Sequence, residues 1–191
     1  MNPHVHFQSN ENQVFWGEIA PCEHIAQFYE HDGVLLDTLS GFIGGGLIAG
    51  ESTIIIATSE HLRALRERLV AANVDLVTAI IEDRYITLNA EIALSSFMVG
   101  EWPDDQLFAD LVTGLIRRAR VNDGRVRAFG EMVALLWARG HVAATVRLEY
   151  LWQQYCQNRN FSLLCAYPKA GFTKDPLNSM AEICAAHTRV L

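Results

Sequence analysis

Short runs of continuous apolar residues alternate along the chain with longer segments whose apolar residues recur at helical spacing. The continuous runs predict buried strands at residues 24–29, 52–58, 85–90, 126–129 and 161–168. The segments with helical spacing predict helices at residues 33–50, 60–73, 90–100, 107–121, 141–160 and 179–191. Strands that alternate with helices pair in parallel and are covered on both faces. The pattern therefore predicts an α/β fold, a three-layer sandwich with a mostly parallel central sheet.

Glycine and short polar residues mark the ends of these helices. Gly50 is expected to end the helix at residues 33–50, and the glycines at residues 44–46 to loosen its last turns. Ser59 is expected to cap the next helix, and Asp104 or Asp105 the helix at residues 107–121. The last helix is expected to pack Met180, Ile183 and Cys184 inward.

The glycine-rich stretch at residues 41–50 raises the question of a phosphate-binding loop. Such a loop follows a strand with the pattern G-x-x-x-x-G-K-[ST], in which backbone N–H groups and the lysine hold the phosphates. The strand at residues 52–58 is followed instead by Ser59, Glu60 and His61, without glycine or lysine. The start of this helix is either an anion site or an ordinary N-cap. Hydrolysis of ATP through a standard phosphate loop is not expected.

Polar side chains gather where the predicted strands end. Ligands of parallel sheets usually bind outside the carboxyl ends of the strands. The polar residues expected at this edge are His31, Asp32, Thr58, Ser59, His61 and Glu131. Glu131 follows a strand among apolar neighbours, so its burial would demand an arginine or histidine partner.

Other candidate ligand-binding residues lie outside this edge group. His24 begins the first strand, and Glu149 lies inside a helix, where an exposed or capping carboxylate is expected. Large aromatic residues are expected to form either the core or a pocket wall; they are Phe28, Tyr29, Trp137, Trp152 and Tyr167.

Length and charge restrict the classes of protein. The 191 residues fit one domain at residues 21–191, preceded by a polar arm at residues 1–20 that is either loose or docked. The net charge of −7 and the pI of about 5.4 argue against nucleic acid as a direct partner. The basic residues between Leu115 and Arg127 are expected on the exposed face and exit of a helix.

The cysteines and the apolar segments indicate the compartment. The four cysteines have no zinc-type spacing and are expected to be free thiols, mostly buried, at positions 22, 156, 165 and 184. No uninterrupted apolar stretch reaches the length of a membrane span. We therefore expect a cytoplasmic protein without a metal, a cofactor or a membrane contact.

Five blocks of the sequence, in this order, resemble the MEDS family, the sensory domain of methanogen and methylotroph regulators such as DcmR. They are HIAQFYEHDGVLLDTLSGFIGGGLIAGE, ATSEHLRALRERL, FGEMVALLWARGHVAATVRLEYLW, FSLLCAYP and ICAAHTRV, which span about residues 23–190. The resemblance implies a fold related to the RecA and KaiC ATPases with a degenerate phosphate loop, and the sensing of small molecules, proposed to be hydrocarbon derivatives. The family-typical positions are His24, Gln27, Phe28, Tyr29, Asp32, Gly130, Glu131, Trp137, Glu149 and Trp152.

Three functions are compatible with these features. The first is a stand-alone signal-transduction protein that binds a small ligand at the carboxyl edge and signals by contact, as a monomer or a homodimer, to a histidine kinase or a transcription regulator. The second is a residual nucleotide-binding protein or NTPase, in which Glu131 polarises a water molecule. The third is a structural interaction module. We expect the first, a protein that is not an enzyme.

Overall fold

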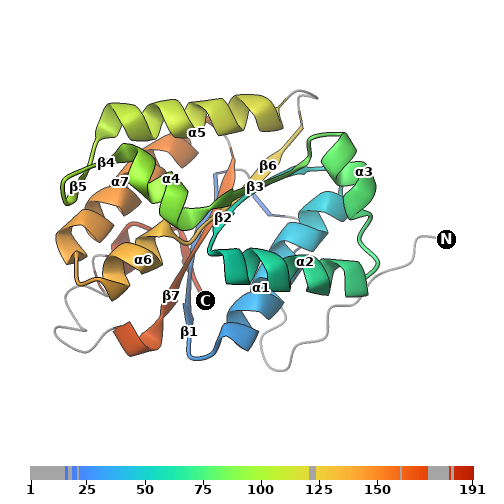
Figure 1. The fold of residues 1–191 in the computed structure, drawn as a ribbon, viewed down its shortest axis with the longest axis horizontal. Coiled ribbons are helices and arrows are strands. Elements are labelled where there is room, and N and C mark those ends of the chain that lie inside the picture. Colours follow the sequence, from blue (N-terminus) through green and yellow to red (C-terminus); the bar gives the residue numbers. More distant parts are fainter. Residues whose placement is uncertain are drawn as a thin grey trace.

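Six parallel strands form the centre of the described part of the molecule (Figure 1). This computed structural model describes residues 16, 19–20, 22–120, 124–159, 161–171, 181 and 183–191. Across the sheet the strands are β3 (Tyr85–Asn89), β2 (Ser52–Ala57), β6 (Val126–Gly130), β7 (Ser162–Pro168), β1 (His24–Tyr29) and β8 (Arg189–Val190). A separate antiparallel pair joins β4 (Met98–Val99) to β5 (Trp102–Pro103). All five predicted strands are present, and every pairing in the large sheet is parallel.

Helices cover both faces of the sheet, which confirms the predicted three-layer α/β sandwich. One face carries α1 (Asp32–Ile48), α2 (Ser59–Ala71) and α3 (Leu76–Ile81). The other carries α4 (Ala90–Phe97), α5 (Asp105–Ala119), α6 (Met132–Ala138) and α7 (Val142–Arg159). In Figure 1 the first group lies to the right of the sheet, and the second lies to its left and above it. None of the helices in the described ranges is long and apolar enough to cross a membrane.

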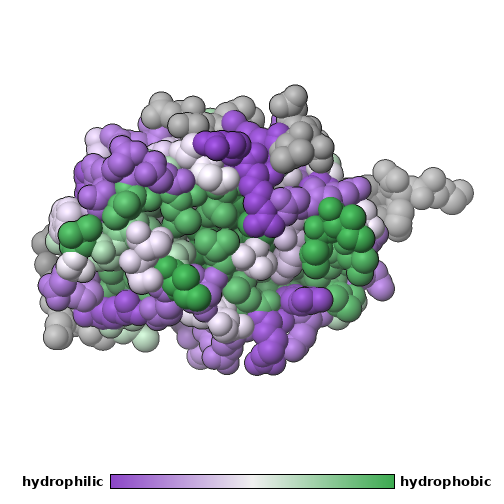
Figure 2. Space-filling view, turned by 45° about the horizontal axis from the view of Figure 1, so that its top comes forward, coloured by the Kyte–Doolittle hydropathy of each residue, from purple (hydrophilic) through white to green (hydrophobic). Residues whose placement is uncertain are grey.

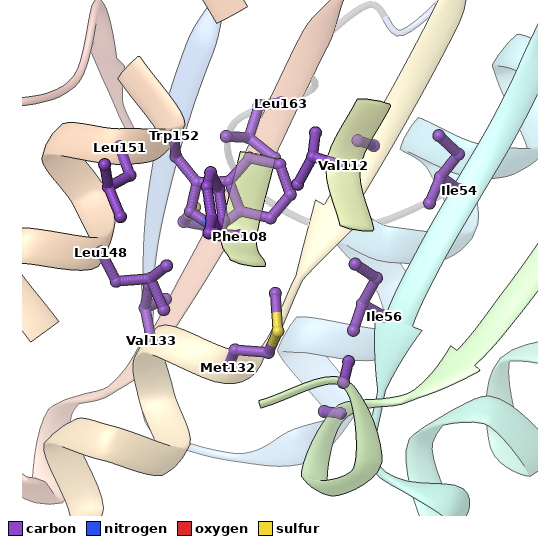
Figure 3. Close-up of a cluster of buried hydrophobic side chains, with 14 of the residues drawn as sticks. Ile54, Ile56, Phe108, Val112, Met132, Val133, Leu148, Leu151, Trp152 and Leu163 are labelled. Atoms are coloured by element: carbon purple, nitrogen blue, oxygen red, sulfur yellow. The ribbon is translucent and has the colours of Figure 1, made fainter. Parts of the chain in front are cut away.

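Alternate side chains of each central strand enter the two halves of the core. In β2, Ile54 and Ile56 pack against α4–α7, whereas Ile55 packs against α1–α3. Figure 3 shows the first of these cores, with Phe108 of α5 among side chains of the sheet, α6 and α7. Because both faces of β2 are buried, its sequence is a continuous apolar run and does not alternate with polar residues.

Most of the glycine-rich stretch, residues 41–48, lies within α1. Gly50 has φ 81° just after the helix, so the prediction that it ends the helix is confirmed. The helix continues through residues 44–46 to Ile48, and the loosening of its last turns by these glycines stays a prediction. A Cβ atom on Gly46 would lie 2.8 Å from Cδ of Arg127. The glycine at this position therefore allows the helix to approach a large buried side chain.

Arg127 is the side chain that fills this space. It was predicted on an exposed helix exit, but its side chain is 1% exposed and forms an ion pair with Glu51. Its Nη1 donates hydrogen bonds to the carbonyl oxygens of Phe42 (3.0 Å) and Trp16 (2.7 Å). Arg117 and Arg118 are exposed on α5, as predicted. Arg127 thus joins β6, α1 and the segment at Trp16 in the interior.

The predicted arm at residues 1–20 lies mostly outside the described residues. Trp16 packs its ring edge-on against Phe42, with centroids 5.6 Å apart, and Ile19 is buried in the core beside α1–α3. These two residues of the segment are docked on the domain.

The C-terminal segment differs from the sequence prediction. Of the described residues in the predicted helix at residues 179–191, residues 181 and 183–185 are helical, and β8 then adds to the edge of the sheet beside Ile25 and Ala26. Ile183 is buried and Cys184 half-buried, whereas Met180 lies outside the described residues.

The short helix α3 was not predicted. Its apolar residues Val77, Ile80 and Ile81 are exposed, so they do not follow the pattern of an amphipathic helix. They form an apolar patch where α3 lies, at the right of Figure 2.

Candidate functional site

The connections of two neighbouring strands diverge at the carboxyl edge of the sheet. β2 and β6 pair in parallel, with Ile56 opposite Gly130. The chain leaves β2 for α2 on one face and leaves β6 for α6 on the other. Such a switch point leaves a crevice at the ends of the strands, where ligands of open α/β sheets usually bind.

Glu131 follows β6 directly at this switch point. Its side chain is 6% exposed. Oε2 accepts a hydrogen bond from the backbone N–H of Thr58 (2.7 Å), and Oε1 lies 2.7 Å from Nδ1 of His61. The prediction that buried Glu131 requires a histidine or arginine partner is confirmed.

The start of α2 is capped from within the chain. Thr58 is its N-cap residue, and its hydroxyl oxygen accepts a hydrogen bond from the N–H of His61 (3.3 Å), so the prediction of Ser59 as the cap is wrong by one residue. The Glu131 carboxylate also lies at this helix start, where free N–H groups and the helix dipole favour negative charge. The anion at this position is therefore the protein's own carboxylate, and an added phosphate would meet its repulsion.

His61 connects the buried carboxylate to the surface. Its side chain is 10% exposed, and Nε2 lies 3.8 Å from Oδ1 of Asp32, whose side chain is 67% exposed. The hydrogen bond that His61 donates to Glu131 raises the pKa of His61, burial opposes this, and the charges of Glu131 and Asp32 add to it. When Nδ1 donates to Glu131, neutral His61 presents Nε2 as an acceptor, and protonated His61 presents it as a donor.

Substitution of Glu131 by Gln is expected to lower the pKa of His61, because it removes the charge that favours the protonated ring. An NMR titration of the His61 ring measures this directly. Asp32→Asn is the matched control and is expected to lower the pKa less, because Asp32 is exposed and more distant. An unchanged pKa in Glu131→Gln would contradict the assigned pairing.

The same pairing makes stability depend on pH. The pKa of His61 is raised in the folded state, so its protonation contributes stability that is fully present below the unfolded pKa, near 6.5, and is lost as the pH rises through the folded pKa. Glu131→Gln is expected to flatten this part of the stability profile in chemical denaturation.

Three further candidates contribute less to this site: Tyr29, predicted as core or pocket wall, and His31 and Ser59, predicted at the edge. Tyr29 is buried, and burial, with the charges of Glu131 and Asp32, raises its pKa to about 12, so its hydroxyl stays neutral. His31 is exposed and makes no side-chain capping bond to α1. Ser59 is exposed, and its hydroxyl accepts a hydrogen bond from the amide of Asn89 (2.9 Å).

The remaining candidates, His24, Phe28, Trp137 and Glu149, belong to a second, enclosed group between α7 and the sheet. The prediction that Glu149 is exposed or capping is wrong, because its side chain is 1% exposed. Oε2 lies 3.3 Å from Nε2 of His24, and Oε1 lies 3.5 Å from Nε2 of His187. Burial disfavours the charge on Glu149, but His187 and His24 outweigh it and hold the pKa of this carboxyl well below its usual range.

Two residues of the enclosed group, Cys165 and His187, were not predicted as site residues, and a third, Tyr167, was predicted only as core or pocket wall. Cys165 Sγ lies 3.6 Å from Oε2 of Glu149, and the hydroxyl of Tyr167 donates a hydrogen bond to Oε1. Burial, with the Glu149 charge, raises the pKa of the Cys165 thiol well above its usual range. The sequence does not distinguish Cys165 and Tyr167 from core residues, because both lie within the apolar run 161–168, at strand positions that usually hold core residues.

Aromatic side chains border the enclosed group. Phe28 stacks on Tyr167 with centroids 5.7 Å apart, and Trp137 meets the same ring edge-on at 6.4 Å. Trp137 is buried in the core, where it forms part of the wall around the enclosed group. Glu131, at the start of the same helix, belongs to the carboxyl edge.

A separate hollow of about 250 Å³ lies between α4, the β4–β5 hairpin and the end of α6. Its lining includes Leu94, Met98 and Leu136 together with Glu91, Arg139 and His141. No residue predicted from the sequence as a site residue lines it.

Comparison with protein families identifies one that matches most of the chain. The model of the MEDS family, described as the MEthanogen/methylotroph, DcmR Sensory domain, matches residues 23–188. A comparison with curated proteins found no match. The matched range contains the whole enclosed group and the residues that meet at the carboxyl edge, which are Asp32, Thr58, His61 and Glu131. The chain belongs to the MEDS family of sensory domains, and its role is sensory or signalling.

Proposed function

We propose that this protein senses a small organic ligand, a hydrocarbon derivative with a polar group, at the carboxyl edge between β2 and β6, and passes the signal by contact to a histidine kinase or a transcription regulator. The observation that carries this proposal is the buried Glu131 carboxylate, which holds both the N–H of Thr58 and the ring of His61 at the switch point of the sheet. The membership in a family of sensory domains agrees with it.

The geometry suits recognition of a hydroxyl, carbonyl or halogen group. Glu131 orients the ring of His61, whose Nε2 makes only a distant contact with the exposed carboxylate of Asp32. A ligand that hydrogen-bonds to this Nε2 would replace a weak contact with a stronger one. Because Glu131 joins the start of α2 to the start of α6, a shift of His61 is expected to move these helices relative to each other, which supplies a signal.

The same contacts favour a sensor over a residual NTPase. A catalytic base needs a free oxygen within hydrogen-bond reach of the attacking water. Both oxygens of Glu131 already bind the protein, and the loop between β1 and α1 is short, with Asp32 in the first turn of the helix. A negative charge at that helix start disfavours a bound phosphate.

Thermal-shift and calorimetric titrations with short-chain alcohols, aldehydes and haloalkanes test this proposal, with ATP and GTP as further probes. We expect members of the organic panel to raise the Tm of the wild type. His61→Gln is expected to weaken their binding about tenfold or more, as the loss of one hydrogen bond to a charged or polar partner does. Glu67→Gln, at an exposed carboxylate of the same helix, is expected to leave binding unchanged.

Two results would overturn the sensor proposal. One is the absence of any ligand-dependent change across the organic panel in the folded wild type. The other is ATP or GTP hydrolysis that is lost in Glu131→Gln and kept in Glu67→Gln, because that would assign Glu131 to catalysis.

A further inference from the structure

The enclosed group brings four metal-ligating side chains together from distant parts of the chain. His24 begins β1, Glu149 lies in α7, Cys165 lies in β7, and His187 precedes β8. One potential ligand atom from each lies within 4.8 Å of the others. Two imidazoles, a thiol and a carboxylate are the ligand types that zinc takes in proteins.

Both histidines are oriented as metal ligands. Nδ1 of His24 lies 3.1 Å from the carbonyl oxygen of Ala186, and Nδ1 of His187 lies 2.6 Å from that of Ile183. A carbonyl oxygen only accepts hydrogen bonds, so each Nδ1 carries the hydrogen, and Nε2 of a neutral ring keeps its lone pair. Metal-bound histidines commonly have this arrangement, in which the second nitrogen donates to a backbone carbonyl.

Both lone pairs face the group, and only that of His24 has a donor near it, the Cys165 thiol at 3.5 Å. Nε2 of His187 has no hydrogen-bond partner, although the side chain is fully buried, and it faces Oε1 of Glu149 at 3.5 Å. Nε2 of His24 faces Oε2 of the same carboxylate at 3.3 Å. Two lone pairs that face a buried carboxylate repel it unless a cation or a proton lies between them. The arrangement therefore calls for positive charge at the centre of the group.

The separations among three of the four ligand atoms match the edges of a tetrahedral site. Zinc bonds of about 2.0–2.1 Å to nitrogen or oxygen and about 2.3 Å to sulfur place neighbouring ligand atoms about 3.3–3.6 Å apart. The atoms Nε2 of His24, Oε2 of Glu149 and Sγ of Cys165 are separated by 3.3, 3.5 and 3.6 Å. They form one face of the tetrahedron. The fourth ligand atom, Nε2 of His187, lies 3.5 Å from Oε1 of Glu149 and within 4.8 Å of the other ligand atoms, so its ring would move closer when the ion binds.

Tyr167 completes the surroundings of this site. Its hydroxyl donates a hydrogen bond to Oε1 of Glu149. This contact orients the carboxylate and leaves Oε2 toward His24 and Cys165. Carboxylate ligands of metals are usually held by such outer hydrogen bonds.

We propose that His24, Glu149, Cys165 and His187 bind a divalent transition-metal ion, with zinc as the expected ion. On binding, Cys165 gives its thiol proton to solvent, and its thiolate forms a bond to the metal without any change of oxidation state. All four positions are filled by protein, which is typical of a structural site. The ion would fasten the segment at residues 183–191 to α7, β1 and β7, beside the hydrogen bond from the Thr188 hydroxyl to the carbonyl of His24 (2.9 Å). This site is distinct from the ligand edge at Glu131.

Cobalt(II) is the spectroscopic probe for this site. The wild-type chain is treated with a chelator, titrated with Co²⁺, and followed by the thiolate-to-cobalt absorption and the visible bands of tetrahedral cobalt. We expect saturation at one ion per chain and displacement by Zn²⁺. Zinc is also expected to raise the Tm and to slow hydrogen exchange of residues 183–191, because a ligand that binds only the folded state stabilises it.

Matched variants assign the ligands. Cys165→Ser and His187→Gln are each expected to weaken cobalt binding by about a hundredfold or more, beyond the loss typical for an outer-shell partner such as Tyr167→Phe. Cys184→Ser and His141→Gln serve as the cysteine and histidine controls and are expected to keep full binding. The thiolate absorption is expected to disappear in Cys165→Ser alone among the cysteine variants.

Two outcomes would overturn the proposal, and the first needs no variant. A folded, chelator-treated wild type that shows neither cobalt absorption nor a zinc-dependent rise in Tm has no such site. Binding that survives both Cys165→Ser and His187→Gln unchanged would place the metal elsewhere.

Discussion

Arg127→Met is expected to reduce the free energy of unfolding by about 3–5 kcal/mol, the usual cost of removing one partner of a buried ion pair. The substitution leaves Glu51 without its partner at the point where α1 turns into β2. It also removes the hydrogen bonds to the carbonyl oxygens of Trp16 and Phe42. Denaturant unfolding followed by circular dichroism measures the loss.

Arg125→Met is the matched control for this prediction, because Arg125 lies two residues earlier on the same segment and is exposed. It is expected to change stability by less than about 0.5 kcal/mol, as surface substitutions usually do. The double variant Arg127→Met with Glu51→Leu removes both charges and is expected to recover part of the stability, since an apolar pair often replaces a buried ion pair without loss. Equal stability of Arg127→Met and Arg125→Met would contradict the assigned role of Arg127.

Phe108→Ala is expected to reduce the free energy of unfolding by about 3–5 kcal/mol, the range for removal of a fully buried aromatic ring. Phe108 meets three other rings edge-on, namely those of Phe97 (5.4 Å), Trp152 (5.0 Å) and Tyr155 (5.7 Å). Figure 3 shows Phe108 beside Trp152 in this core. The cavity left by the ring would remain in a core whose surrounding helices are fixed to the sheet. Thermal and denaturant unfolding both report this loss.

Leu107→Ala, at the adjacent position of α5, is the control for Phe108. Leu107 is 43% exposed, so its truncation removes little buried area and is expected to cost less than about 1 kcal/mol. A similar cost for both substitutions would show that the helix as such, and not the packing of Phe108, determines the effect.

The strands and most helices could be predicted because their signals are local. The run at residues 52–58 is apolar because both faces of β2 are covered by helices. The burial can therefore be predicted from consecutive residues. Asp104 caps α5 through bonds to N–H groups two and three residues later, so its role also follows from nearby residues. The short helix α3 was missed because its apolar residues face solvent and carry no amphipathic pattern.

The candidate edge was predicted in part. The rule that carboxyl ends of parallel strands share one edge correctly brought together Asp32, Thr58, His61 and Glu131. The rule gives a common edge but no side-chain directions, so His31 and Ser59, which are exposed, could not be separated from the residues that pair. The sequence resemblance to the MEDS family was confirmed over residues 23–188, whereas a relation to the RecA and KaiC ATPases stays an expectation from that resemblance.

By itself, the sequence determined the three-layer α/β sandwich, the family, and the polar edge around Glu131, because each depends on local hydrophobic patterns or on blocks of consecutive residues. Only the tertiary structure showed which charged and metal-ligating side chains are buried in the interior and which residues they meet there. Arg127 meets Glu51 across 76 residues, and Cys165 meets His24 across 141, after the parallel crossovers have brought their strands and helices together. From sequence alone, a charged side chain is predicted to be exposed, and a histidine or cysteine is predicted to have no special role. Burial of such a side chain is stable only where opposite charge and hydrogen bonds surround it, and these partners are known only from the tertiary structure.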